Sequence, residues 1–454
     1  MYSRKSAAFI ISFLVVLTPI CKSHAEGQDN QNKEGSVLSL VDAEKWAIQN
    51  SYDSKISEVF IEGFDQKIKS IGSHRYPKLV VEGSYKYLET VPALTTMSGT
   101  VYLGDNKNYS IGPSLVYNLF DGGVLRNTIK SLKKLKVSKE LDRDYVHAMV
   151  LFAVRLAYLN VLLAEDQLQL AKEGLKLSQT QNLDIKKKRR LGASSELELS
   201  LSNRDLFNQK LKWLEAENFL KKAAIDLSKL IFGSGEEKVY VPKRSSMGWG
   251  VLVDFDSLEK IIQYLDLTLT QQKKPPAQVS SLEMKVASSR MEADIESSKY
   301  WPQLSLKLRS SLDYPNGPQL EEINQNSISV NLTMPIFDWG EISGAKAEKL
   351  FQMRAYEEKK AKLERDIFIN TQKLKVELEN LKAQKDIVNQ LVLESTKVAD
   401  INLKSYKSGR VQFIEVERAN VRKFEAQTKE LILKGQIFAK LSQWIAISSG
   451  GLNE

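Results

Sequence analysis

The sequence predicts a mixed α and β protein made mostly of long, coiled-coil-like helices, with four amphipathic strands and an internal duplication. Three observations lead to this prediction. Two long stretches contain no proline, apolar residues in them follow heptad spacing, and short motifs recur in both halves of the chain at a constant offset. With 454 residues, of which 42% are hydrophobic and 27% charged, the chain can form more than one ordinary domain and has no disordered composition.

The N-terminus resembles a secretory signal peptide over residues 1–25. Two basic residues and a short apolar run precede small residues that suit cleavage after Ala25. The apolar run is shorter than the ~20 residues of a spanning helix, so an uncleaved anchor is only the alternative. Lipidation of Cys21, the single cysteine, is a second alternative. The mature chain would then have no cysteine and no disulfide.

The charge balance does not indicate a nucleic-acid partner. The formal net charge is +9, but 65 basic residues are spread among 56 acidic ones. The one concentrated basic run, residues 186–190, fits the C-terminal end of a helix, where cations interact favourably with the helix dipole.

Proline placement allows two very long helices. No proline occurs between Pro113 and Pro242 or after Pro335. A single helix from Gly123 to Arg190 would be about 100 Å long. Its apolar residues alternate three- and four-residue spacing, as in Tyr145, Met149, Phe152, Leu156, Leu159 and Leu163. A second apolar stripe beside the first indicates that each helix packs against two neighbours, as in a wall of helices.

Four segments alternate with period two and predict strands. They lie near residues 79–87, 110–119, 304–313 and 327–336. Each has about ten residues, the length of a tilted strand that crosses a membrane. Alternating apolar and polar residues are typical of an outer-membrane barrel wall. An amphipathic sheet on a soluble core is the alternative, and the signal peptide favours the barrel.

The chain repeats one unit of helix, two strands and a long helical hairpin. Phe120-Asp121-Gly122-Gly123 matches Phe337-Asp338-Trp339-Gly340 at an offset of 217, and Gly192 matches Gly409 at the same offset. Upstream, Tyr76-Pro77 matches Trp301-Pro302 at an offset of 225. We therefore expect a first repeat over 26–232, a connecting segment over 233–256, a second repeat over 257–448 and a tail over 449–454.

The residues at the junctions have mechanical roles in this prediction. Pro77 and Pro302 would end helices and begin strands. Asp121 and Asp338 would cap the long helices. Gly192 and Gly409 would supply the positive φ that reverses the chain at the far end.

Together these features resemble the outer membrane efflux protein family, the TolC-like channels. The resemblance covers roughly Val37 to Ser448 and is carried by a set of motifs. These are the opening helix with Leu40, Ala43 and Ala47, the helix-to-strand prolines, both Phe-Asp-x-Gly junctions, and Tyr406-x-x-Gly409 followed by Ile414-Glu415-Val416.

The resemblance implies a homotrimer in the outer membrane of a Gram-negative bacterium. Four membrane strands from each subunit would contribute to one shared transmembrane β-barrel, because four strands alone cannot close a barrel. The helices would form a periplasmic α-barrel. The implied function is a passive duct for efflux or type I secretion, supplied by an inner-membrane pump and a periplasmic adaptor protein and embedded in outer-membrane lipid.

The resemblance also places a periplasmic gate after the second hairpin tip. Glu415 matches the first of the family's acidic constriction positions, whereas Arg418 stands at the second. Glu198 is the counterpart of Glu415 in the first repeat. Three converging carboxylates would favour cations and could bind a metal cation. Alternatively, Glu415 is a solvated surface residue or pairs with Arg418 one helical turn away.

The hairpin tips resemble the surface on which adaptors dock in this family. The residues concerned are Leu191, Gly192, Ala193, Ser408, Gly409 and Arg410. The alternative is that these residues only make a tight turn, and both roles are compatible.

No pattern of residues predicts an enzyme, a cofactor or a resident metal. The three histidines are isolated from one another, and no phosphate-binding glycine loop or catalytic triad spacing is present. The competing hypothesis is a periplasmic coiled-coil adaptor or structural spacer without membrane strands. Such a protein would have one helical hairpin between β-rich domains rather than two duplicated hairpins that each follow paired strands.

Overall fold

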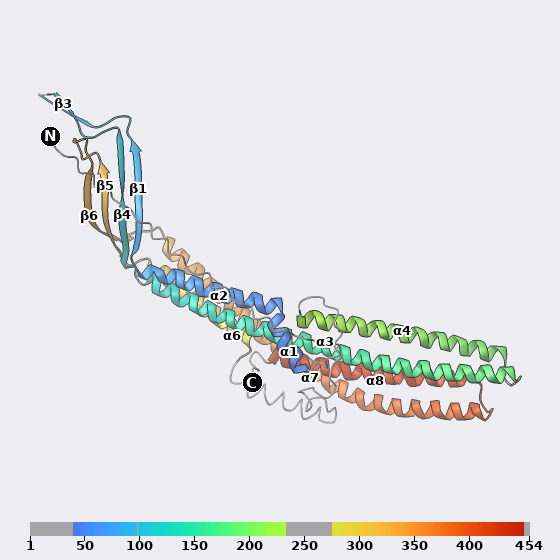
Figure 1. Cartoon of the computed structure of the whole chain (residues 1–454). Coiled ribbons are helices and arrows are strands. Elements are labelled where there is room, and N and C mark those ends of the chain that lie inside the picture. The colour runs from blue at the N-terminus through green and yellow to red at the C-terminus, as the bar shows by residue number, and fades with distance from the viewer. Residues whose placement is uncertain (1–39, 98, 233–274, 449–454) are drawn as a thin grey trace, which may run out of the picture. The chain divides into compact units, whose positions relative to one another are not determined.

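The computed structural model describes residues 40–97, 99–232 and 275–448 (Figure 1). The expected signal peptide 1–25, the connecting segment 233–256 and the tail 449–454 lie outside the described residues. The elements are, in chain order, α1 (Leu40–Asn50), α2 (Tyr52–Gly72), the short 3-10 helix η1 (Ser73–Arg75), β1 (Lys78–Tyr87), β2 (Ala93–Thr96), β3 (Gly99–Tyr102), β4 (Lys107–Phe120), α3 (Val124–Arg190), α4 (Glu196–Phe232), α6 (Ala277–Ser298), β5 (Gln303–Tyr314), β6 (Ile323–Thr333), α7 (Glu341–Lys407) and α8 (Phe413–Ser448).

The predicted mixed fold with an internal duplication is confirmed. Helices α3 and α7 each contain 67 residues and begin 217 positions apart. Helix α6 begins 225 positions after α2, the offset of the helix-to-strand prolines. The long proline-free stretches are therefore continuous helices, as the heptad pattern predicts.

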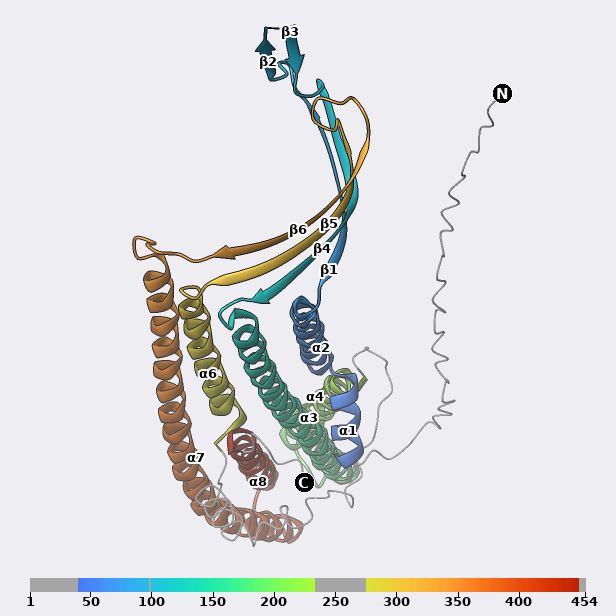
Figure 2. The same cartoon turned by 90° about the vertical axis from the view of Figure 1, so that its left-hand side faces the viewer.

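Four strands form one antiparallel sheet in the order β1-β4-β5-β6, and Figure 2 shows them side by side. The register places apolar residues of neighbouring strands opposite each other, as in the row Leu79, Leu115, Leu308 and Ile328. Leu79 and Ile328 are 73% and 77% exposed. The apolar face of this sheet is therefore uncovered by any described part of the same chain.

A short hairpin of β2 and β3 lies between β1 and β4 and is not among the four strands that the sequence predicts. The hairpin pairs Leu94 with Val101 and Thr95 with Thr100. These residue types favour strands, but the run is too short to show a period of two. Gly99, with φ of 131°, begins the returning strand.

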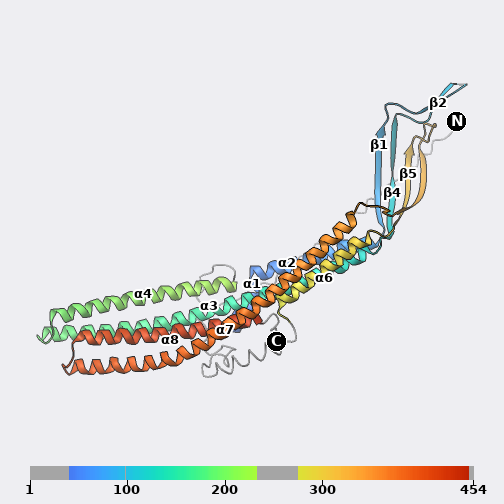
Figure 3. The same cartoon turned by 180° about the vertical axis from the view of Figure 1, so that it is seen from behind.

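Buried apolar residues of the helices form three clusters, the smallest of which joins Ile185 of α3 to Phe413 and Val416 of α8. Helix α1 inserts Leu40, Ala43 and Ala47 against Val154 and Tyr158 of α3, and all five are buried. A second cluster joins α7 and α8 around the buried Trp444 and contains Leu374, Leu378 and Val388 of α7, which follow heptad spacing. Figure 3 shows α4 beside α3 and α8 beside α7. The stripe of α7 thus contacts α8, whereas in the predicted stripe of α3 Leu159 is buried and Met149 is 40% exposed.

Buried serines join α3 to α6. The hydroxyl of Ser131 lies 2.9 Å from that of Ser288, and the hydroxyl of Ser138 lies 2.9 Å from that of Ser281. Small side chains that satisfy each other's hydrogen bonds allow the two helices to approach closely without leaving a buried polar group unpaired.

The predicted helix caps are present at both strand-to-helix junctions. The Asp121 carboxylate accepts hydrogen bonds from the amides of Gly123 (2.9 Å) and Leu125 (2.7 Å). The Asp338 carboxylate accepts them from Gly340 (3.2 Å) and Ile342 (3.0 Å). Each aspartate satisfies two of the orphan donors at the start of a 67-residue helix.

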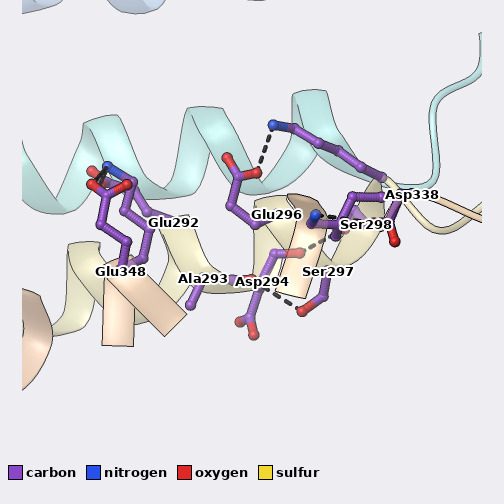
Figure 4. A network of polar contacts seen from close by, with 11 residues as sticks. Glu292, Ala293, Asp294, Glu296, Ser297, Ser298, Asp338 and Glu348 are labelled. Carbon is purple, nitrogen blue, oxygen red and sulfur yellow. Dashed lines mark hydrogen bonds and ion pairs between the residues drawn. The ribbon is translucent and has the colours of Figure 1, made fainter. Parts of the chain in front are cut away.

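The start of α7 is also tied to the end of α6, as the close view in Figure 4 shows. Lys349 of α7 lies between Glu348, at 3.4 Å, and Glu292 of α6, at 3.9 Å. In the last turn of α6, the hydroxyl of Ser298 donates a hydrogen bond to the Asp294 carbonyl at 2.9 Å. The end of one repeat's first helix is thereby fixed beside the start of its long helix.

The two junctions differ at one position. Gly122 has φ of 67°, and its counterpart Trp339 has φ of 52°. Trp339 is the one residue other than glycine with positive φ in the part of the chain that the structure describes. A residue other than glycine in this left-handed conformation costs about 1–3 kcal/mol. The backbone at Trp339 is therefore strained relative to that at Gly122.

Candidate functional site at the hairpin tips

Both hairpin tips use the same glycine turn. The amide of Ala193 donates to the Lys188 carbonyl at 2.8 Å, and Gly192 follows the helix with φ of 74°. At the second tip, the amide of Arg410 donates to the Ser405 carbonyl at 2.9 Å, and Gly409 has the same φ. The Gly192 amide also donates to the Arg189 carbonyl, and the Gly409 amide to the Tyr406 carbonyl, each at 3.0 Å. At each tip the two bonds together form the Schellman motif, which requires a residue with positive φ and therefore favours glycine. The predicted role of both glycines is confirmed.

The six predicted tip residues are all exposed. They are Leu191, Gly192, Ala193, Ser408, Gly409 and Arg410. Leu191 is 83% exposed, although it is a large apolar residue at a helix end. The turns therefore present their outer surfaces to the surroundings rather than to the helices of the same chain.

Glu198 is held at the start of α4. Its amide donates to the Ser195 hydroxyl at 3.1 Å, and its carboxylate accepts a hydrogen bond from Ser194 at 2.6 Å. Ser195 thus caps the helix, and Glu198 places its negative charge in the first turn, where the helix dipole favours it. The side chain has a local structural role at this position.

Glu415 lies in the first turn of α8 and pairs with Arg418. The Arg418 guanidinium lies 3.0 Å from the Glu415 carboxylate, and the two side chains are 63% and 47% exposed. This pairing is one of the two alternatives to a gate that the sequence leaves open for Glu415. Because both partners are solvated, the pair contributes little to stability, typically below about 1 kcal/mol.

The structure adds an ion pair between the two hairpins. The guanidinium of Arg204 on α4 lies 2.7 Å from the carboxylate of Glu417 on α8. The side chain of Glu417 is only 10% exposed, whereas that of Arg204 is 56% exposed. Sequence reasoning missed this pair. The available signal was that Glu417 stands beside the buried Phe413 and Val416, because a charge on such a seam needs a partner.

Aromatic contacts link the two hairpins next to their turns, at the ends of α3 and α7. The ammonium of Lys188 on α3 lies 4.3 Å from the centre of the Tyr406 ring on α7. Tyr406 also meets the buried Phe413 edge to face, with ring centres 5.7 Å apart. Burial, followed by the charges of Glu198 and Asp184, raises the pKa of the Tyr406 hydroxyl above its usual value. Tyr406 is therefore an uncharged platform for Lys188 at neutral pH.

A second polar network lies on the sheet, on the face opposite the exposed apolar residues. The Lys307 ammonium lies 2.8 Å from the Glu82 carboxylate, and Arg309 lies 3.5 Å from the same carboxylate. Arg309 also donates to the Ser110 hydroxyl at 2.6 Å. The network joins β1, β4 and β5, so this sheet has one charged face and one apolar face.

The residues that the structure describes contain no group of three or more histidine, cysteine, aspartate or glutamate side chains that could hold a metal ion. The two carboxylates predicted for the gate each have a partner in the same chain, because Glu415 pairs with Arg418 and Glu198 accepts a hydrogen bond from Ser194.

Comparison with known proteins identifies the family. The family model described as outer membrane efflux protein matches residues 47–232 and 273–443. The chain therefore belongs to the outer membrane efflux protein family.

Several solved structures share the fold along most of their length. The outer membrane protein VceC from Vibrio cholerae is 12% identical, with a TM-score of 0.71, over 91% of this chain and 97% of that chain. The CmeC outer membrane channel from Campylobacter jejuni is 16% identical, with a TM-score of 0.69, over 93% and 90%. The open state of the MtrE outer membrane channel from Neisseria gonorrhoeae is 15% identical, with a TM-score of 0.67, over 91% and 89%. No curated protein sequence matches the chain.

Proposed function

We propose that three copies of this chain form a passive duct across the outer membrane of a Gram-negative bacterium, for efflux or type I secretion. The observation that carries the proposal is the four-stranded sheet with one exposed apolar face, one charged face and two open edges. In the described residues, β1 and β6 each pair on one side only. Unpaired strand edges are not tolerated in lipid, so further strands must close the sheet into a barrel.

Copies of the same chain are the simplest source of those strands. Four strands are too few for a membrane barrel, whose smallest examples have about eight. In this arrangement the apolar face contacts lipid and the network of Glu82, Lys307 and Arg309 faces the lumen. The long helices continue the duct into the periplasm. The two duplicated hairpins, each preceded by paired strands, argue against the alternative of an adaptor or spacer.

An inner-membrane pump and a periplasmic adaptor would supply the cargo and the energy, since the duct itself is passive. We propose that the adaptor docks on the exposed tip residues Leu191 to Ala193 and Ser408 to Arg410. The gate would lie just beyond them, where Glu415 and Arg418 begin α8 and Glu198 begins α4.

The oligomer provides the first test. We expect the full-length protein to fractionate with outer membranes and, in detergent, to have the native mass of three chains. The open four-stranded sheet of each chain must be completed by strands of other chains, and the family resemblance implies that there are three. Recovery as a detergent-free soluble monomer would reject the duct.

The gate provides the second test. We expect Glu415→Ala to raise single-channel conductance or to weaken block by divalent cations, because it removes a carboxylate while leaving the Arg418 cation. Planar bilayer recordings measure both quantities. The control is Glu394→Ala, which removes an exposed carboxylate paired with Lys397 on α7, thirteen residues before the end of the helix. Equal conductance and block in the Glu415→Ala variant and the wild type would place the gate elsewhere.

A further inference from the structure

The second strand-to-helix junction carries a tryptophan that the first junction could not hold. A side chain at Gly122 would place its Cβ 2.5 Å from the Ser298 carbonyl oxygen and 2.8 Å from the Cβ of Trp301. The first junction is therefore pressed against the end of α6 in the same chain. Trp339 occupies the matching position of the second junction, yet it is 90% exposed and its one described ring contact is with Phe337, at 4.6 Å between centres.

The duplication indicates which segment corresponds to Ser298 and Trp301 in the other repeat. At the offset of 225 they match Ser73 and Tyr76. Both pairs make the same bond, since the Tyr76 amide donates to the Ser73 carbonyl at 3.0 Å and the Trp301 amide donates to the Ser298 carbonyl at 3.1 Å. Tyr76 is 70% exposed, and Ser73 is exposed as well. An exposed junction and an exposed matching segment thus stand at opposite edges of one sheet.

The sheet register brings these two edges together between copies. Within the chain, β4 pairs with β5, and Phe120 lies opposite Leu304. The matching pair across a boundary between copies is β6 with β1 of the next copy. By the same offsets, Phe337, four residues beyond the end of β6, would lie opposite Leu79. In that register Trp339 faces the segment from Ser73 to Tyr76, just as Gly122 faces the segment from Ser298 to Trp301.

We propose that Trp339 of each copy packs against Ser73–Tyr76 of the next copy. Its indole would fill the space at the boundary between β6 of one subunit and β1 of the next, a boundary here called the seam between subunits. This inference rests on the proposed trimer. The seam within one chain has no space for a Cβ at this position. The seam between copies must therefore be wider here, and the indole fills the added space against Tyr76. The burial of an aromatic side chain between copies offsets the strained backbone at Trp339.

Cross-linking tests the contact directly. We expect the double variant Trp339→Cys, Tyr76→Cys to give covalent dimers and trimers with a short bismaleimide. Each single variant should give neither, which also controls for Cys21. The pair Trp339→Cys, Leu191→Cys is the matched negative control, because Leu191 lies at the hairpin tip. Absence of cross-links in a protein whose native mass is three chains would overturn the inference and leave the duct intact. A monomeric native mass would instead reject the duct.

A second variant separates the contact from folding. Trp339→Gly copies the residue of the first junction and is compatible with the positive φ, so we expect the chain to fold and reach the membrane. We also expect subunit association to weaken roughly tenfold or more, measured as trimer dissociation in a detergent series. Unchanged dissociation would contradict the proposed packing of Trp339 between subunits. Trp339→Phe identifies the part of the tryptophan fluorescence that comes from Trp339. If dissociation is unchanged and brominated phospholipids quench that part, the indole contacts lipid rather than a second copy.

Discussion

Replacing Arg204 with alanine should release the hairpin tips from each other and open the entrance of the proposed duct. The substitution leaves the Glu417 carboxylate, which is 10% exposed, without its cation. An unsatisfied buried group of this kind costs about 1–3 kcal/mol. Because Arg204 and Glu417 lie on different hairpins, this cost destabilises the observed packing of α4 beside α8. A change of 1.4 kcal/mol shifts an equilibrium about tenfold, so we expect a marked rise in open-channel occupancy.

The two partners of this pair are not equivalent, and the difference provides a control. Glu417→Ala removes the buried carboxylate and leaves Arg204, which is 56% exposed and can be solvated. We therefore expect Glu417→Ala to affect stability less than Arg204→Ala. Arg418→Ala breaks an exposed pair and should change stability by less than about 1 kcal/mol. Planar bilayer recordings and urea unfolding measure these effects. An Arg204→Ala channel that opens no more often than the wild type would show that this pair does not hold the closed state.

We expect Gly112→Ala to reduce assembly in the membrane several-fold. A Cβ at Gly112 would lie 2.0 Å from the Ser310 carbonyl oxygen and 2.6 Å from the Ser311 Cα, both of them backbone atoms of β5. Neither atom can move without separating β4 from β5. Overpacking of this kind costs about 1–3 kcal/mol or more, and here it acts on the strand pairing that joins the two repeats.

The matched control for this substitution is Gly83→Ala, in the neighbouring strand of the same sheet. The nearest atom to a Cβ at Gly83 is the Ile111 Cγ1, at 3.8 Å, which is an ordinary contact. The amount of trimer in outer membranes should fall several-fold for Gly112→Ala and remain at the wild-type level for Gly83→Ala. Equal amounts for both variants would mean that β5 can shift to accept the methyl group.

The long helices and their ends could be predicted because their causes are local. The absence of proline, the heptad stripes, the capping residues Asp121 and Asp338 and the turn residues Gly192 and Gly409 each act within a few positions of the chain. Because the chain is duplicated, each junction motif occurs twice in the sequence, and the two copies support the same prediction. The strands were predictable because both faces of the sheet are chemically distinct, which makes the period of two visible in the sequence.

The contacts between distant segments could not be predicted in the same way. Arg204 and Glu417 are 213 positions apart, and no local pattern selects this pair from the many charged residues of two helical surfaces. The β2–β3 hairpin is too short for its alternation to stand out from a loop. The positive φ of Trp339 was equally hidden, although its alignment with Gly122 showed which position to inspect.

The equal lengths of α3 and α7 have a consequence for how such a chain can change over time. Because each helix has 67 residues, the two tips of one chain finish after the same number of turns from the sheet. Losing one heptad from α3 alone would retract one tip by about 10 Å and leave its twin protruding. A partner that binds both tips at once would then lose one of its two contact sites on each chain. Tolerated insertions and deletions should therefore arise as matched pairs, one in each half of the gene.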